Sequence, residues 1–176
     1  MKTKIPFLLL ALVLNCFSHA EEPPENRASR GYFVGLGPMK LSGLNSSETG
    51  YYFTGGYAFN YEKTLLKLNG EAMFRSGALV LTGGIGAAYF PKELVYKELN
   101  PFIGANFGIG TSRIRPNETG IGEWTTGFVL GPEIGVQFFR NSDVMLEVSG
   151  KWSTFLESGS VGTPSYSVLK ISLYFL

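Results

Sequence analysis

Ser149 and Lys151 are the pair of residues in this sequence whose spacing most readily suggests catalysis. Side chains two positions apart in an extended strand point to the same face, so the lysine amine could activate the serine hydroxyl as a nucleophile. Met145 and Glu147 share that face by the same spacing, as in an ordinary strand with one polar side. A structural role for Ser149 and Lys151 is therefore the better interpretation.

Histidine and cysteine, which most often serve in catalysis and metal binding, occur once each, as His19 and Cys16. Both lie in an N-terminal segment that has the features of a signal peptide. Two lysines give it a positive start, an apolar run follows over 5–14, and small residues precede a cleavage point after Ala20. We predict that residues 1–20 are removed.

The chain that remains after cleavage has no imidazole, thiolate or disulfide, and no calcium-loop pattern. We therefore predict no catalytic residue, no metal site and no cofactor. In an alternative, Cys16 would be a lipidated first residue. Asn15 disfavours this reading, because it occupies a position that requires a small side chain.

The composition favours membrane strands. Charged residues make up 16% of the chain, against about 25% in ordinary soluble domains, while aromatic residues reach 14%. The net charge of +1 argues against a nucleic-acid binder, which would carry a basic stripe. After the signal peptide, no apolar run approaches the roughly 20 residues of a transmembrane helix.

Eight segments with strand character, separated by turn residues, follow residue 30. They cover approximately 31–41, 51–61, 65–75, 78–90, 102–111, 124–139, 144–154 and 166–176. Each is long enough for a tilted membrane strand of about 9–11 residues. The sequence predicts an all-β fold: a closed, antiparallel, up-and-down transmembrane β-barrel of eight strands at 31–176, after a flexible periplasmic lead-in at 21–30.

Alternation along these segments separates bulky apolar residues from small and charged ones. At 124–139, Phe128, Leu130 and Ile134 share one face, whereas Glu133 and Gln137 share the other. A soluble barrel would turn the apolar face inward and expose a surface dominated by glycine and alanine. Glycine weakens strands, and such a surface would lack the charged side chains that favour solubility. We favour the opposite orientation, with lipid around the apolar face and small residues beside charges in a narrow lumen.

In this orientation seven charged residues point into the lumen. They are Lys67, Glu71, Arg75, Glu133, Glu147, Lys151 and Lys170. Because buried charges must be paired, we expect Glu133 and Glu147 to bond Lys170 and lysines or an arginine of neighbouring strands. A structural salt-bridge plug is favoured over a conducting or ligand-binding lumen.

Aromatic residues gather near the ends of the segments, as in the two girdles of a membrane barrel. The predicted periplasmic girdle contains Tyr32, Tyr61, Tyr89, Phe90, Phe102, Phe138, Phe139 and Phe175, and the outer one Tyr51, Tyr52, Phe74, Trp124, Trp152 and Tyr166. Long polar loops are expected outside the cell at 42–50, 112–123 and 155–165, and short turns inside at 62–64 and 140–143. The connection at 91–100 is long for an inner turn, and Ser76-Gly77 is short for an outer one.

The mature chain resembles the small outer-membrane β-barrels: the OmpA transmembrane domain, OmpX, OmpW and the opacity-protein-like families. The resemblance lies in GYFVGLG at 31–37, PFIGANFGIG at 101–110 and the final strand. These motifs mark architecture more than activity. Such proteins usually end in an aromatic residue that resembles an assembly signal, whereas here Phe175 precedes a final Leu176.

The resemblance implies a non-enzymatic outer-membrane protein with both chain ends in the periplasm. It would support the envelope or present external loops to a ligand or host surface. Its other partners would be membrane lipid, lipopolysaccharide and the barrel-assembly machinery, and not nucleic acid. Enzymes that resemble this size class depend on a histidine, which the mature chain lacks. The alternative is a narrow channel for small hydrophobic molecules, like that proposed for OmpW-type barrels. A lateral opening in the wall would favour it.

Overall fold

The structure is a computed structural model that describes residues 29–42, 48–61, 63–91, 98–114, 123–140, 142–156 and 165–176. The predicted signal peptide and most of the predicted lead-in lie outside these residues, as do most residues of the three long loops. Ser29 and Arg30, assigned to the lead-in, instead begin the first strand. Within the described residues, no helix is long and apolar enough to cross a bilayer.

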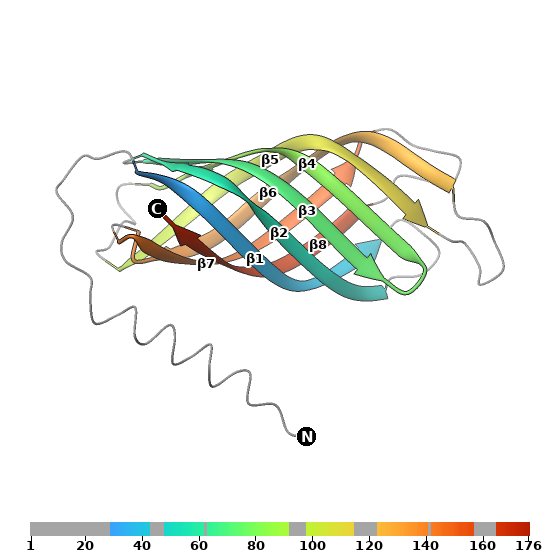
Figure 1. The fold of residues 1–176 in the computed structure, drawn as a ribbon, viewed down its shortest axis with the longest axis horizontal. Helices are drawn as coiled ribbons and strands as arrows, with labels where there is room; N and C mark the ends of the chain where they lie inside the picture. The colour runs from blue at the N-terminus through green and yellow to red at the C-terminus, as the bar shows by residue number, and fades with distance from the viewer. Residues whose placement is uncertain are drawn as a thin grey trace, which may run out of the picture.

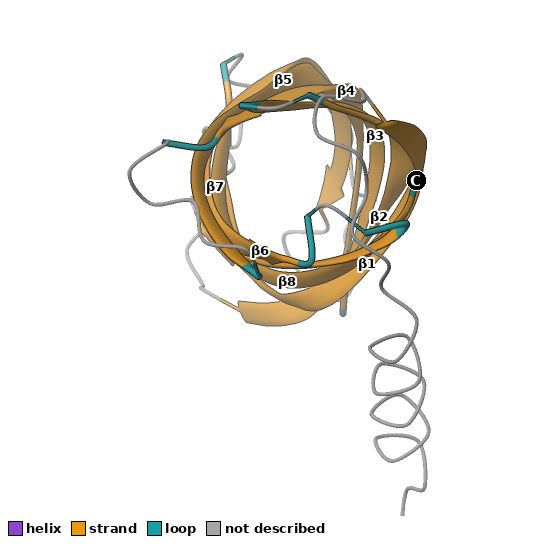
Figure 2. Ribbon diagram, turned by 90° about the vertical axis from the view of Figure 1, so that its left-hand side faces the viewer, coloured by secondary structure: helices purple, strands orange, loops and turns teal. Residues whose placement is uncertain are grey.

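Eight antiparallel strands close into one barrel (Figures 1 and 2). They are β1 (Ser29–Ser42), β2 (Glu48–Asn60), β3 (Thr64–Arg75), β4 (Ala78–Tyr89), β5 (Leu99–Ile114), β6 (Glu123–Phe138), β7 (Val144–Phe155) and β8 (Ser165–Phe175). Each strand pairs with its sequence neighbours, and β8 closes the ring against β1. This confirms the predicted fold class of a closed, up-and-down, eight-stranded barrel.

Both the start of β1 and the end of β8 lie at one end of the barrel, which we call the terminal end; the other is the far end (Figure 1). At the far end, Ser76 and Gly77 alone join β3 to β4, with Gly77 at a φ of 73°. Glycine adopts such a positive φ without strain. The short connection noted in the sequence is thus a tight hairpin.

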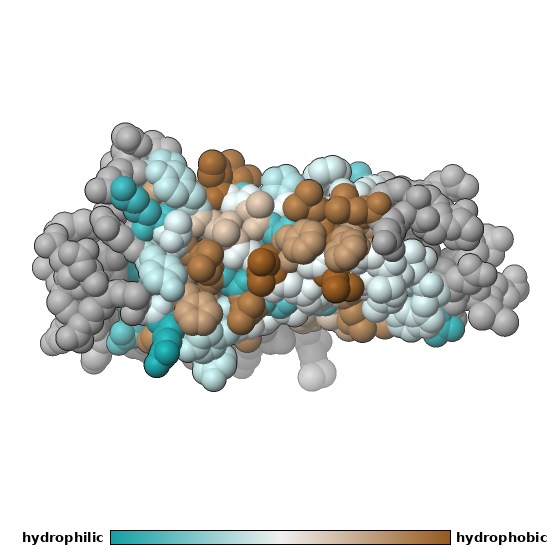
Figure 3. Space-filling view, turned by 90° about the horizontal axis from the view of Figure 1, so that it is seen from above, coloured by the Kyte–Doolittle hydropathy of each residue, from teal (hydrophilic) through white to brown (hydrophobic). Residues whose placement is uncertain are grey.

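Period-two alternation determines which side chains face inward. On β7, Met145, Glu147 and Lys151 are buried, whereas Trp152 between the buried positions is exposed. The same pattern holds on β3 and β8. Bulky apolar side chains therefore cover the outer wall, and in Figure 3 they gather over the middle of the visible face.

Glycines on the inner face allow the strands to approach closely. A Cβ added to Gly56 would lie 1.9 Å from the backbone oxygen of Leu68, the residue before Asn69, which is the partner of Gly56 in the β2–β3 ladder. Such contact is possible only without a side chain, which explains why the inner wall is rich in glycine. A Cβ added to outward-facing Gly150 would meet nothing within 4 Å.

The buried ionic layer as candidate functional site

Six charged side chains form a layer inside the barrel, contributed by four strands. They are Lys67 and Glu71 on β3, Glu133 on β6, Glu147 and Lys151 on β7, and Lys170 on β8. All six are almost fully buried, with at most 6% of any residue exposed. We call this set the ionic layer.

Lys67, Glu133, Glu147 and Lys170 form one group of alternating charges. Lys170 Nζ lies 2.7 Å from Glu133 Oε1 and 3.3 Å from Glu147 Oε1. Lys67 Nζ approaches the same two carboxylates, at 3.0 Å from Glu133 Oε2 and 3.7 Å from Glu147 Oε1. Each ammonium thus contacts both carboxylates, and the two positive charges balance the two negative ones, as buried charges require.

Neutral side chains donate further hydrogen bonds to both carboxylates of this group. Asn106 donates to Glu133 Oε2 at 2.9 Å, and Gln137 and Tyr174 donate to Glu147 Oε2 at 3.1 and 2.7 Å. The Ser149 hydroxyl lies 2.9 Å from Glu133 and 3.1 Å from Glu147. These bonds leave the oxygens of both carboxylates engaged within the protein.

Glu71 and Lys151 form the second group. Lys151 Nζ lies 2.5 Å from Glu71 Oε1, which also accepts a 2.7 Å bond from Asn69. The hydroxyls of Thr82 and Tyr166 donate to Glu71 Oε2 at 2.9 and 3.2 Å. Across the two groups, three carboxylates balance three ammoniums.

The pairing crosses the barrel as well as following its wall. Lys170 on β8 bonds Glu147 on the neighbouring strand β7 and Glu133 on β6, so the expected pairing of both carboxylates with Lys170 is present. Lys67 and Glu71 come from β3 and reach β6 and β7 through the interior. Sequence alternation gives the face of a residue but not the strand opposite, so this cross-barrel connection was not predicted.

Arg75, the seventh residue assigned to the lumen, lies at the far end of β3 and is half-buried. Buried Met73, which belongs to an apolar cluster, separates it from Glu71 on the inward face of the strand. Arg75 therefore lies beyond the ionic layer rather than within it.

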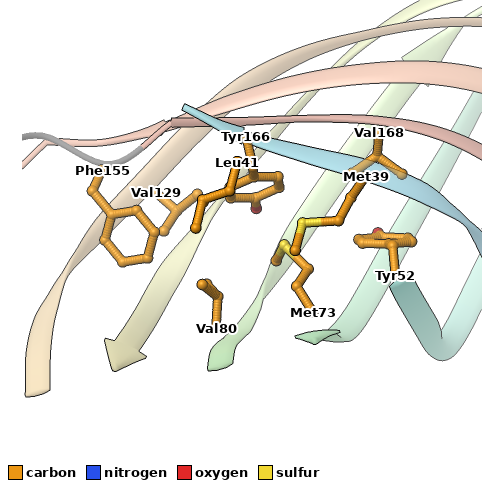
Figure 4. Packing of buried hydrophobic residues seen from close by; sticks show 9 residues of the cluster. All are labelled: Met39, Leu41, Tyr52, Met73, Val80, Val129, Phe155, Tyr166 and Val168. Atoms are coloured by element: carbon orange, nitrogen blue, oxygen red, sulfur yellow. The ribbon is translucent and has the colours of Figure 1, made fainter. Parts of the chain in front are cut away.

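Apolar side chains close the interior on both sides of this layer. The far-end cluster comprises Met39, Leu41, Tyr52, Met73, Val80, Val129, Phe155, Tyr166 and Val168, whose side chains pack together in Figure 4. The terminal-end cluster comprises Phe33, Ala58, Leu65, Ala88, Phe90, Phe102, Met145 and Tyr174. All three regions occur in turn along β8: Val168 belongs to the far-end cluster, Lys170 to the ionic layer and Tyr174 to the terminal-end cluster.

The girdle assignment of Tyr166 is wrong. Its side chain is fully buried in the far-end cluster, and its hydroxyl reaches the ionic layer. Tyr52, Phe90 and Phe102 also face inward rather than toward the girdles. Proximity to a strand end does not determine which face an aromatic residue occupies. The alternation along the strand does, and it places Tyr166 on the same face as Lys170.

Other predicted girdle residues do lie on the outer wall. Tyr32 and Tyr51 are 70% and 72% exposed, and Trp124 and Trp152 slightly more than half. Tyr61, Tyr89, Phe74 and Phe175 are also exposed, and Phe138 and Phe139 are partly so. Arg113 lies over the Trp124 ring, with 5.7 Å to its centroid, so a cation accompanies the aromatic at the far end.

Arg140 is an interior charge that sequence reasoning assigned only to a turn. It is 95% buried, its guanidinium carbon lies 3.7 Å from the Phe90 ring centroid, and it donates to the backbone oxygen of Tyr61. Asn60 in turn donates to the Arg140 backbone oxygen at 3.3 Å. Arg140 thus ties the β6–β7 turn to the β2–β3 turn over the terminal end. Turn residues have no alternation, so no periodic signal revealed this burial.

The arrangement offers little reactive chemistry. Ser149 and Lys151 both face inward, but the serine bonds Glu133 and Glu147 while the lysine bonds Glu71. The ionic layer has the geometry of a structural plug, with its polar atoms directed at one another. Within the described residues, no group of three or more histidine, cysteine or acidic side chains could hold a metal ion.

No family model matches the sequence, and no curated protein matches it. Solved structures are similar. Neisserial surface protein A shares 14% identity with a TM-score of 0.72, covering 85% of this chain and 98% of that one. The N-terminal β-barrel domain of Pseudomonas aeruginosa OprF shares 11% identity, with a TM-score of 0.53 and coverage of 84% and 100%.

The outer membrane enzyme PagL is also similar, with 12% identity, a TM-score of 0.50 and coverage of 82% of this chain and 98% of PagL. The resemblance to the OmpA, OmpX, OmpW and opacity-like families in particular stays a prediction. Identities this low establish the fold alone: the chain has the eight-stranded β-barrel fold of small outer-membrane proteins.

Proposed function

We propose that this protein is a non-enzymatic, integral outer-membrane β-barrel of a Gram-negative bacterium that supports the envelope or presents its far-end loops to surface partners. The observation that carries the proposal is the inverted polarity of the barrel. Ile134, Ile171 and Leu169 are more than half exposed, while Glu147 and Lys170 are almost wholly buried. A soluble barrel would have the reverse distribution.

Lipid is the environment that suits such an outer wall. Soluble monomers rarely expose contiguous apolar patches larger than a few hundred square ångströms. Here exposed apolar side chains occur on all eight strands, from Val34 on β1 to Ile171 on β8. Hydrocarbon would solvate this belt, with the aromatic residues at its two borders meeting the headgroups.

The terminal end would face the periplasm. The far-end connections 115–122 and 156–164, after β5 and β7, are longer than the terminal-end turns 61–63 and 139–143, although the terminal-end connection 90–98 is also long. Membrane barrels place short turns in the periplasm and longer loops outside. Lipopolysaccharide would then surround the far end, the barrel-assembly machinery would insert the chain, and an external ligand or host surface would meet the loops.

A surface or structural role is favoured over a hydrophobic channel. Two apolar clusters and the ionic layer between them occupy the interior, so polar and apolar solutes alike would have to displace packed side chains. Each strand also pairs with both neighbours around the ring. A lateral opening, which would favour a channel, is not seen among the described strands.

Outer-membrane fractionation tests the proposal. The protein expressed with its full N-terminal segment should sediment with the outer membrane in a sucrose gradient. It should also migrate differently on gels before and after boiling, as folded membrane barrels do. Recovery as a soluble periplasmic protein would contradict the membrane location and the surface role together.

A further inference from the structure

The outer wall carries an apolar groove, which we call the wall groove. It lies over β3, β4 and β5 and has a volume of about 380 Å³. Leu66, Leu68, Ile85 and Phe107 line it, together with the alanines Ala87 and Ala105. The two alanines are paired across the β4–β5 ladder, so the wall lacks bulky side chains at that point.

The groove offers no free polar group. Atoms of Lys67 and Asn106 contribute to its lining, but both side chains bond Glu133 on the inner side of the wall. Water needs several polar partners in a site of this kind and would find none. An empty groove would deprive its lining of dispersion contacts. An apolar occupant is therefore favoured.

The position of the groove identifies its occupant. It lies within the belt of exposed apolar side chains, with Leu68 and Ile85 more than half exposed, and it is continuous with the proposed lipid interface. It also lies in the terminal half of the barrel, because Leu66 is near the start of β3 and Ala87 is near the end of β4. In the proposed orientation this half meets the periplasmic leaflet, which consists of phospholipid.

We propose that the wall groove is a binding site for one acyl chain of a phospholipid in the periplasmic leaflet. The inference rests on the proposed membrane location and adds a specific lipid site to it. A volume of about 380 Å³ falls in the range of small-ligand sites, roughly 300–1,000 Å³, and accommodates a length of acyl chain. Elsewhere on the belt of exposed apolar side chains, bulk lipid would contact the wall without entering a groove.

Quenching of tryptophan fluorescence by a brominated phospholipid measures occupancy directly. The reporter is Phe107→Trp, at the side of the groove, in a background with Trp124→Phe and Trp152→Phe. Dibrominated phosphatidylethanolamine is titrated at low mole fraction into the full mature protein, folded in micelles. A control reporter, Leu36→Trp, faces outward on β1, away from the groove.

We expect saturable quenching at Phe107→Trp and quenching at Leu36→Trp that only follows the mole fraction of brominated lipid. Filling the groove with Ala87→Phe, at a lining alanine, should abolish the saturable component. The matched change Ala72→Phe, at an outward alanine of β3 outside the groove, should retain it. Both variants must show the heat-dependent gel shift, so that loss of folding is not mistaken for loss of binding.

Two results would overturn the inference. Quenching proportional to the mole fraction at both reporters would mean that the groove holds bulk lipid only. Quenching at Phe107→Trp below that of the control, together with a dimer in native mass spectrometry, would identify a second copy of the chain as the occupant. Either result would leave the membrane location intact, since fractionation tests that location separately.

Discussion

Lys67 Nζ on β3 lies 3.0 Å from Glu133 Oε2 on β6, although β4 and β5 separate the two strands along the barrel wall. The bond therefore spans the interior, and Lys151 and Glu71 form a second crossing between β7 and β3. An eight-stranded barrel is just wide enough for side chains to fill it, which brings ions on opposite walls within bonding distance. These contacts connect opposite walls of the barrel, and the charges of the ionic layer cancel.

Loss of the Lys67 ammonium should destabilise the barrel. Lys67→Met leaves Glu133 and Glu147 to share Lys170, and an uncompensated buried charge costs roughly 3 kcal/mol. The free energy of unfolding, from urea titration in vesicles followed by the gel shift, should fall by that order. Lys63→Met, at an exposed turn lysine, is the matched control. Equal stability of the two variants would contradict the cross-barrel bond.

The Glu71–Lys151 pair should show strong coupling in a double-mutant cycle. Glu71→Gln and Lys151→Met each leave one buried charge without its partner, whereas the double variant removes both charges. We expect the double variant to be more stable than the sum of the two single losses predicts, by at least 1 kcal/mol. Additive losses would mean that the two groups do not interact.

Tyr166→Phe should lower the free energy of unfolding by about 1.5 kcal/mol, because it removes a hydrogen bond to a charged group. The hydroxyl donates to Glu71 Oε2 at 3.2 Å, and the ring is buried. Tyr51→Phe, at an outward position 72% exposed, should have little effect. If the two changes had the same effect, Tyr166 would belong to a girdle after all.

Gly56→Ala should be poorly tolerated, while Gly150→Ala should be neutral. The new Cβ at position 56 would lie 1.9 Å from a backbone oxygen, so strands β2 and β3 would have to separate, at a cost of about 2 kcal/mol. At position 150 it would meet nothing within 4 Å. Thermal unfolding of both variants checks the difference, and a stable Gly56→Ala barrel would contradict the close strand packing.

The fold could be predicted from the sequence because every strand encodes its faces locally. The alternation of Lys67, Glu71 and Met73 with Leu66, Leu68 and Phe74 assigns the two faces of β3, and the turn residues between segments give the number of strands. The same alternation places Tyr166 on the inward face of β8 with Lys170. Its closeness to the strand end, on which the girdle prediction was based, does not reveal this.

Other features depend on closure of the ring and have no local signal. Which ions face each other across the interior follows from strand number, tilt and register together, so the Lys67–Glu133 bond was beyond sequence reasoning. Arg140 lies in a turn, where no periodicity separates buried from exposed positions. The wall groove arises from Ala87 and Ala105, which become adjacent only when β4 and β5 pair in register.

The central claim, that bulky apolar side chains face lipid while small and charged ones fill the interior, is tested most directly along β8. Nitroxide labels placed singly at Val168, Leu169, Ile171, Ser172 and Leu173 in vesicles report their accessibility to oxygen, which concentrates in hydrocarbon. We predict a period of two, with high accessibility at Leu169, Ile171 and Leu173 and low accessibility at Val168 and Ser172. High accessibility to a water-soluble relaxant at Leu169, Ile171 and Leu173, with little accessibility to oxygen, would contradict the account.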